Sequence, residues 1–106
     1  MKSKHERTID DLVERLLNSG KVFELMKKHV EYKRGRYCGE VDLLVKLKGS
    51  EWFHFYEIKS NYSTKNYRKA IEQYARYCKA HPSRKVIGVY VTDGLMMPLQ
   101  RNLKKK

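Results

Sequence analysis

Two acidic residues and a lysine lie where a hairpin would bring them together. Two alternating segments flank a Gly-Ser pair at 49–50, a pattern typical of a two-residue hairpin turn. This register places Asp42 opposite Glu57. It also places Glu40 opposite Lys59. Side chains alternate along a strand, so these four share one face, and like charges directly opposed on one face destabilise a sheet. The pair therefore predicts either a wet sheet edge or a cation held between carboxylates.

These residue types suit metal-assisted phosphodiester hydrolysis. Mg²⁺ takes oxygen ligands from one or two carboxylates and keeps several waters. A bound divalent ion polarises a phosphate and lowers the pKa of its water. Lys59 projects to the same face, where it could orient that water or stabilise the developing charge. An exposed hairpin with an ordinary salt-bridge ladder explains the same spacing, so the spacing alone leaves both interpretations open.

The other face of the hairpin is apolar and predicts a core. Its expected cross-strand pairs are Val41 with Ile58, Leu43 with Tyr56, Val45 with His54 and Leu47 with Trp52. His54 therefore reads as a core or boundary histidine rather than as a metal ligand. The second histidine that stands alone, His29, has no ligand partner at a typical spacing either.

The order of the acidic residues and lysine resembles the PD-(D/E)XK nuclease superfamily. Asp42 is followed, after an apolar run, by Glu57-Ile58-Lys59. Residues 39–44, GEVDLL, resemble the second-strand motif of its resolvase-like and RecB-like members. Residues 73–77, QYARY, are similar to the Q-h-x-x-Y motif of RecB-type nucleases, where h is apolar. Val41 stands where a proline often precedes the aspartate, at a position that varies within the superfamily.

The resemblance implies a nuclease that cleaves DNA with Mg²⁺ or Mn²⁺. It implies that Asp42, Glu57 and the main-chain carbonyl of Ile58 bind the metal. Lys59 would act on the attacking water or the phosphate. Gln73 would support the site. Without the resemblance, its position in the sequence would indicate an ordinary surface side chain.

The first helix is predicted over 6–18, after a loose basic start. Apolar residues recur there at helical spacing: Ile9, Leu12, Val13, Leu16 and Leu17. Members of the superfamily often add a glutamate from this helix, and Glu6 lies nearest the apolar stripe. Asp10 and Glu14 remain alternatives. Acids that complement the helix dipole explain the same residues.

The remaining elements complete an α/β fold in one domain, residues 1–106. Residues 21–37 fit a short helix or a strand, and the superfamily core places a strand at 28–34. We predict a helix over 65–80, a buried parallel strand over 85–92 and a partial helix over 95–103 broken by Pro98. The expected core is restriction-endonuclease-like: helix, three strands, helix, strand, with helices flanking a mixed sheet. Residues 101–106 form a basic tail.

The charge points to a nucleic acid partner. Lys and Arg number 24 against 12 Asp and Glu, a net charge of +12. Basic residues expected to contact phosphates are Lys33, Arg34, Arg36, Lys65, Arg68 and Lys69, with a solvated surface as the alternative. The mixture of Tyr62, Tyr67 and Tyr74 with Arg68 could contact single-stranded bases, although core packing also explains Tyr74.

Several classes of protein are disfavoured. No apolar run approaches the roughly 18–20 residues of a membrane span, and no signal peptide opens the chain, so we expect a cytoplasmic protein without a membrane partner. Cys38 and Cys78 form no Cys-x-x-Cys pair, which disfavours a zinc ribbon. Two cysteines also cannot hold the four-cysteine iron–sulfur cluster of some RecB-type relatives.

Size and charge resemble most the archaeal or phage-type Holliday-junction resolvases. Those enzymes are dimers, because two symmetric nicks need two sites, so a homodimer is expected. Two other classes stay open. One is a binding module that keeps the fold without cleaving, and the other is a basic RNA-associated protein with a structural hairpin.

Overall fold

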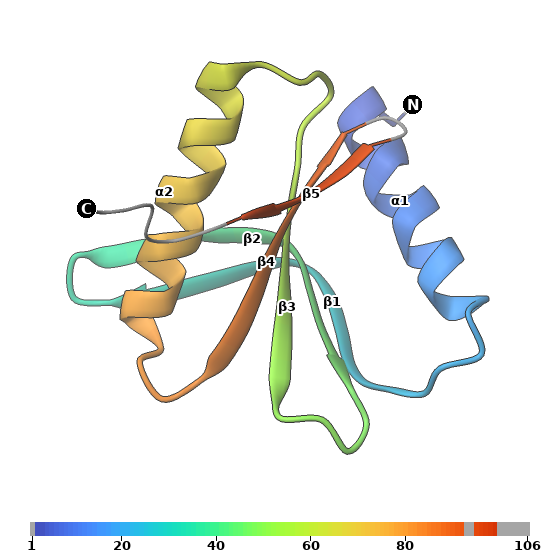
Figure 1. Ribbon diagram of the computed structural model, residues 1–106, viewed down its shortest axis with the longest axis horizontal. Helices are drawn as coiled ribbons and strands as arrows, with labels where there is room; N and C mark the ends of the chain where they lie inside the picture. The colour runs from blue at the N-terminus through green and yellow to red at the C-terminus, as the bar shows by residue number, and fades with distance from the viewer. Residues whose placement is uncertain (1, 93–94, 100–106) are drawn as a thin grey trace.

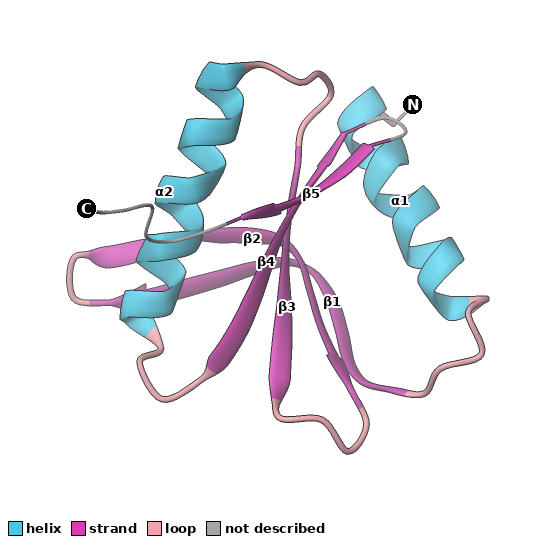
Figure 2. Cartoon of the chain, in the orientation of Figure 1, coloured by secondary structure: helices cyan, strands magenta, loops and turns pink. Residues whose placement is uncertain are grey.

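Two helices cover opposite faces of a five-stranded sheet (Figures 1 and 2). The computed structural model describes residues 2–92 and 95–99. The elements in chain order are α1 (Lys4–Leu17), β1 (Phe23–Arg34), β2 (Tyr37–Leu47), β3 (Trp52–Ile58), α2 (Thr64–Ala80), β4 (Lys85–Thr92) and β5 (Leu95–Leu99). The strands lie in the order β1-β2-β3-β4-β5, and β3 and β4 are the parallel pair. The α/β class and the mixed sheet are therefore confirmed.

Helix α2 is the crossover between the parallel strands. Parallel neighbours need such a connection, since a tight turn cannot return the chain to the same end. The side chain of Ser63 caps the helix by accepting a hydrogen bond from the Asn66 amide, at 3.0 Å. The helix ends at Ala80, before His81 and Pro82, as the sequence predicts.

The predicted register of the β2–β3 hairpin is confirmed over four pairs, and the pairs predicted beyond them, including Asp42 with Glu57, do not form in the ladder. Its pairs run from Leu43 opposite Tyr56 to Lys46 opposite Phe53. The turn is longer than the expected two residues, because β2 ends at Leu47 and β3 starts at Trp52. Gly49 has φ +83°, a left-handed conformation that favours glycine.

Both faces of the hairpin are buried, where the sequence suggested one. The face beneath α1 buries Ile9, Leu12, Leu43, Val45, Tyr56, Ile58 and Val91. The face beneath α2 buries Leu44, Phe55, Tyr74, Tyr77 and Tyr90 among others. Tyr74 lies so close to Gly88 that a Cβ there would approach its ring to 2.8 Å. The face that carries Glu57 is therefore a second core and not a wet surface.

The sheet bends where β1 passes His29. His29 has φ +54°, and the ladder between β1 and β2 skips this residue. Val41 was expected to pack with Ile58, but it lies in the core beneath α2 while Ile58 lies beneath α1. The bend and the sheet twist separate the two side chains.

Three element predictions need correction. The strand before the hairpin runs over Phe23–Arg34, so it begins earlier than 28, and the helical alternative for this stretch is wrong. Helix α1 begins at Lys4 within the segment expected to be loose. Residues Leu95–Leu99 form an edge strand paired with β4 instead of a helix, and Pro98 is tolerated because an edge strand leaves one side unpaired. The predicted tail at 101–106 lies outside the described residues, as does the part of the predicted 95–103 helix after residue 99.

Two further expectations concern cysteines and membranes. Cys38 is exposed and Cys78 is buried, and both remain thiols. Within residues 2–92 and 95–99, neither helix has the length and apolar character to cross a bilayer.

Candidate active site

Strands β2 and β3 separate at the point where the predicted carboxylates lie. Their pairing stops at Leu43 opposite Tyr56. Beyond this pair β2 continues with β1, and β3 continues with β4 as far as Ile58 opposite Val91. In Figure 1 the β1–β2 hairpin turns aside beneath α2, while β3 runs on towards the loop before α2. Asp42 and Glu57 are the first residues past the separation, so each lies in a fork of the sheet.

The Asp42 side chain takes the place of a backbone hydrogen-bond acceptor for Ile58, because β2 and β3 are no longer paired there. Its Oδ2 accepts a hydrogen bond from the Ile58 amide at 2.8 Å. The carboxylate is 14% exposed. The amide of Ile58 would be unpaired without it, and burying an unpaired amide costs free energy. Asp42 is thus held rigidly at the fork, with its remaining lone pairs available.

Glu57 is the buried carboxyl of the site. Its side chain is 4% exposed, and Oε2 lies 3.5 Å from Lys59 Nζ. Oε1 is buried and has no hydrogen-bond partner among the described residues. Burial, reinforced by the charge of Asp42 and only partly offset by Lys59, raises the pKa of Glu57 to about 8. At neutral pH this carboxyl keeps its proton unless a cation joins it.

Lys59 lies at the rim of the fork. Its side chain is 27% exposed and pairs with Glu57. Its backbone amide bonds to the Val91 carbonyl at 2.9 Å, which extends the β3–β4 pairing by one residue. Lys59 therefore lies beside Glu57, as the sequence predicts, and it is also within reach of solvent.

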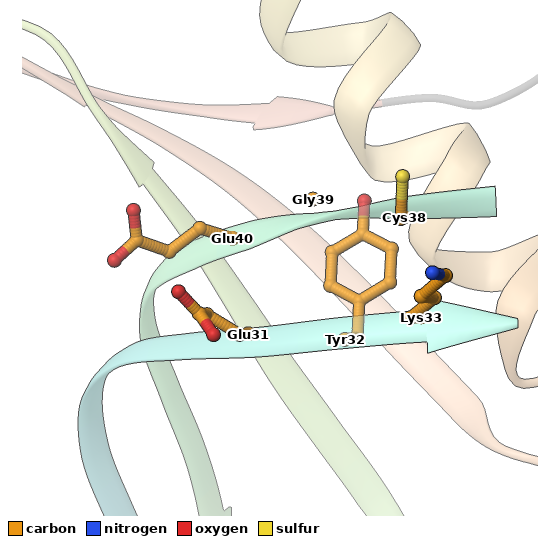
Figure 3. Close-up of a pocket in the computed structure, with 6 residues that line it drawn as sticks. All are labelled: Glu31, Tyr32, Lys33, Cys38, Gly39 and Glu40. Atoms are coloured by element: carbon orange, nitrogen blue, oxygen red, sulfur yellow. The ribbon is translucent and has the colours of Figure 1, made fainter.

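The predicted register placed Glu40 opposite Lys59, but the structure does not pair them. It lies opposite Glu31 across β1–β2, and its Oε2 is 3.4 Å from His29 Nδ1. Because β2 leaves β3 at the fork, the register no longer holds at Glu40. An open groove of about 490 Å³ runs beside it, lined by Glu31, Tyr32, Lys33, Cys38, Gly39 and Glu40 (Figure 3).

His5 is a site residue that the sequence analysis missed. Its Nε2 lies 2.8 Å from the Ile58 carbonyl oxygen and 3.4 Å from Asp42 Oδ2. These are two of the oxygens expected to bind metal. The spacing of Ser3 and Glu6 could have revealed it, because Ser-x-x-Glu is a capping signal that starts the helix before His5. Ser3 does cap α1, accepting from the Glu6 amide at 3.1 Å.

Glu6, the acid expected from the first helix, lies elsewhere. It is 3.0 Å from His29 and 3.4 Å from Lys28, and Lys28 also lies 2.9 Å from Asp10. We call Glu6, Asp10, Lys28 and His29 the outer ion-pair cluster. Partial burial opposes the shift, but His29 and Lys28 lower the pKa of Glu6, and Lys2 and Lys28 lower the pKa of Asp10. No contact joins Glu6 to Asp42 or Glu57 among the described residues, so the placement favours His5 as the helix residue of the site.

Gln73 has a buried side-chain oxygen without a donor among the described residues, although the residue as a whole is half-buried. Its Oε1 has no hydrogen-bond partner within the described part of the chain. It lies on α2, one residue before Tyr74, which packs on the core beneath that helix. A buried acceptor oxygen without a donor is uncommon, and a bound water or ligand would satisfy it.

The basic residues expected to bind phosphates form two groups. Lys65, Arg68 and Lys69 are exposed on the first half of α2, which starts at the end of the sheet where β3 ends (Figure 1). Lys33, Arg34 and Arg36 are exposed on the β1–β2 hairpin. There the Tyr37 ring lies 5.4 Å from Arg36 and 5.8 Å from Lys79 of α2. Only the first group lies at the same end as Lys59.

The donor set fits a divalent cation. Asp42, Glu57 and the Ile58 carbonyl supply hard oxygen ligands, and His5 adds a nitrogen beside two of them. The unpartnered Oε1 of Glu57 is the observation that favours a cation, since a metal would satisfy this oxygen and displace its proton. Among the described residues no three acidic, histidine or cysteine side chains already converge as a ready-made cage. Comparison of the chain with protein-family models and with curated proteins found no match in either.

Proposed function

We propose that this protein is a metal-dependent nuclease that hydrolyses phosphodiester bonds of DNA, on a restriction-endonuclease-like core. The observation that carries the proposal is the buried Glu57, whose Oε1 is unpartnered and whose pKa is raised to about 8 beside Asp42 and Lys59. Strongly perturbed carboxyls concentrate at functional sites. The order of residues that resembles PD-(D/E)XK nucleases supports the same assignment.

Each residue has a distinct role in this proposal. Asp42 and Glu57 would hold Mg²⁺ or Mn²⁺ with the Ile58 carbonyl, and the ion would polarise the phosphate and lower the pKa of its water. Asp42 is kept in place by the Ile58 amide. Lys59 places a positive charge at the rim, where it can stabilise the charge that develops on the phosphate.

His5 and Gln73 support the same centre. His5 contacts the Ile58 carbonyl and Asp42, so it would be a neighbour or an additional ligand of a metal held by these oxygens. Gln73 offers an unpaired acceptor that a metal-bound water could satisfy. Glu6 could add charge only through His29, which it contacts directly.

DNA is the substrate that the charge favours. A net charge of +12 raises the local concentration of polyanions, and Lys65, Arg68 and Lys69 lie at the site's end of the molecule. A homodimer would place two sites on one substrate, as two symmetric nicks in a four-way junction require. The junction therefore belongs in the substrate panel.

The test is cleavage of labelled linear duplex, single-stranded and four-way-junction DNA with Mg²⁺ or Mn²⁺. Wild type should cut at least one substrate, and Asp42→Asn and Lys59→Ala should not. Lys85→Ala is the matched control, because Lys85 is an exposed lysine at the start of β4 and pairs with Glu51. Its activity should match wild type.

A non-catalytic binding module is the second candidate. The observation that favours it is the hydrogen bond from the Ile58 amide, which gives Asp42 a structural role without any metal. Tight DNA binding by all variants, with no cutting at low salt by any of them, would establish this candidate and exclude the nuclease.

A further inference from the structure

Three tyrosine rings pack together beside the candidate site. Tyr62, Tyr67 and Tyr90 contact one another, with ring centroids 5.5–6.5 Å apart. Tyr90 packs edge-on against both others, at interplanar angles of 85° and 84°. Tyr90 is buried, whereas Tyr62 is 50% exposed. One large aromatic side chain is therefore supported from beneath and open to solvent above.

Hydrogen bonds hold these rings in position. The Tyr90 hydroxyl donates to the Asn61 carbonyl at 3.1 Å, which fixes the residue next to Tyr62. The Tyr67 hydroxyl donates to the Pro98 carbonyl at 2.7 Å and so ties α2 to β5. An exposed ring on a rigid support loses little conformational entropy when a flat group stacks on it.

The tyrosines are close to the carboxylates in the fold. Tyr90 lies directly opposite Glu57 in the β3–β4 ladder, and Tyr62 follows Lys59 by three residues. Lys65 and Arg68, both exposed, start the helix immediately after Tyr62. An aromatic face next to exposed cations is the arrangement that binds unpaired nucleotides, where bases stack and phosphates pair with the cations.

We propose that Tyr62 stacks on an unpaired base next to the scissile phosphate, so that the substrate is single-stranded or locally unpaired at the cut. This inference rests on the proposed nuclease function, because it assigns the substrate class of the same site. Bases in an intact duplex stack on each other and present no free face to Tyr62.

The experiment compares binding of two single-stranded oligonucleotides of equal length, one with bases and one abasic, without metal. The abasic strand keeps the phosphates, so the ratio of the two affinities isolates stacking from charge. Fluorescence anisotropy should show wild type preferring the base-bearing strand by about 10-fold, the scale expected of one stacked base. Tyr62→Ala should lose this preference, and Tyr62→Phe, which keeps the ring, should retain it.

Trp52→Ala is the matched control. Trp52 is another exposed aromatic residue, at 43%, and it starts β3 at the end away from Glu57. The control should keep the wild-type preference. A Tyr62→Ala protein that keeps the preference, or a Trp52→Ala protein that loses it equally, would overturn the proposal.

Cleavage of the same base-bearing oligonucleotides with Mn²⁺ separates the two claims. If wild type cuts but Tyr62→Ala binds and cuts single strands as well as wild type does, only the stacking role fails. If wild type cuts nothing, the proposed nuclease function fails, and with it the placement of the base beside a scissile phosphate.

Discussion

The candidate active site and the outer ion-pair cluster are built from the same residue types. Each contains two carboxyls, a lysine and a histidine, and Asp10 of the outer cluster also pairs with a second lysine, Lys2. The site has Asp42, Glu57, Lys59 and His5, and the outer cluster has Glu6, Asp10, Lys28 and His29. Composition therefore cannot distinguish them, and the difference lies in burial and in pairing.

Pairing satisfies the outer cluster and leaves the site incomplete. Lys28 lies within 3.4 Å of Glu6 and within 2.9 Å of Asp10, and the three side chains are 27–40% exposed. Hydrogen bonds to the cations lower the pKa of both carboxyls. In the site Glu57 is 4% exposed, and its pKa is raised instead. An acidic group becomes a functional candidate when its neighbours fail to satisfy it.

The cleavage rate should show the largest difference between substitutions in the candidate site and substitutions in the outer cluster. Asp42→Asn and His5→Ala should lower the cleavage rate, Asp42→Asn by about 1000-fold because a metal contribution of several kcal/mol is lost. Glu6→Gln should cost less than about 10-fold, since its partners are Lys28 and His29. Rates measured under single-turnover conditions decide between the two helix residues. A Glu6→Gln protein as inactive as Asp42→Asn would return the catalytic role to Glu6.

The pH dependence of stability should distinguish the buried carboxyl of Glu57 from the carboxyls of the outer cluster. The folded pKa of Glu57 lies near 8, above its ordinary 4.5, so the folded state binds the extra proton between these values. The unfolding free energy should therefore fall as pH rises from about 5 to 8, by a few kcal/mol from this group. Glu57→Gln should remove that fall.

Urea denaturation at pH 5.5 and 8 measures the effect as a difference between variants. The difference cancels the contributions of other ionisable groups that the two variants share. His54 and His81 both have a pKa lowered by burial and nearby positive charge. Equal pH slopes for wild type and Glu57→Gln would contradict the assignment.

The stabilisation by a divalent ion at pH 8 should also differ between the candidate site and the outer cluster. A divalent ion at about 100 times its dissociation constant adds roughly 2.7 kcal/mol to the stability of a folded state that binds it. Mn²⁺ should raise the Tm of wild type and leave Asp42→Asn unchanged. Glu6→Gln should respond as wild type does, because both carboxyls of the outer cluster are already paired with cations. Differential scanning fluorimetry with a chelator control records these shifts.

The outer cluster itself should show the smallest effect. Lys28→Met removes one cation from two partly exposed pairs, which solvent already screens. The loss of Tm should be slight and should shrink further in 0.5 M salt. A large, salt-independent loss would show that these pairs hold α1 on the sheet.

The sequence predicts best the structure that local chemistry determines. The glycine at 49 and the alternation on either side are enough for the four observed pairs of the β2–β3 register, which put Asp42 and Glu57 one residue past the last pair. The helix at 64–80 follows from its apolar stripe and from Ser63 before it. These features depend on neighbours in sequence, which a pattern can reveal.

The features that the sequence misses depend on contacts between distant segments. His5 belongs to the site because α1 crosses the fork, 53 residues before the carbonyl that it contacts. The strand Leu95–Leu99 exists because β4 offers it an edge, although Pro98 argued for a broken helix. The separation of β2 and β3, beyond which Asp42 bonds to the Ile58 amide, lies beside His29, a residue whose positive φ no pattern indicates.

The parallel pairing of β3 with β4 also fixes the order in which the site can be completed. The β1–β2–β3 meander pairs neighbours in sequence, while β4 joins β3 only after α2 has formed the crossover. Contacts between distant segments form slowly, because a long loop must close first. Tyr90 arrives opposite Glu57 in that step, so the carboxyl becomes buried last. Proton uptake by Glu57 during refolding at pH 7 should thus report the final closure of the chain, which an indicator dye in a stopped-flow mixer would time.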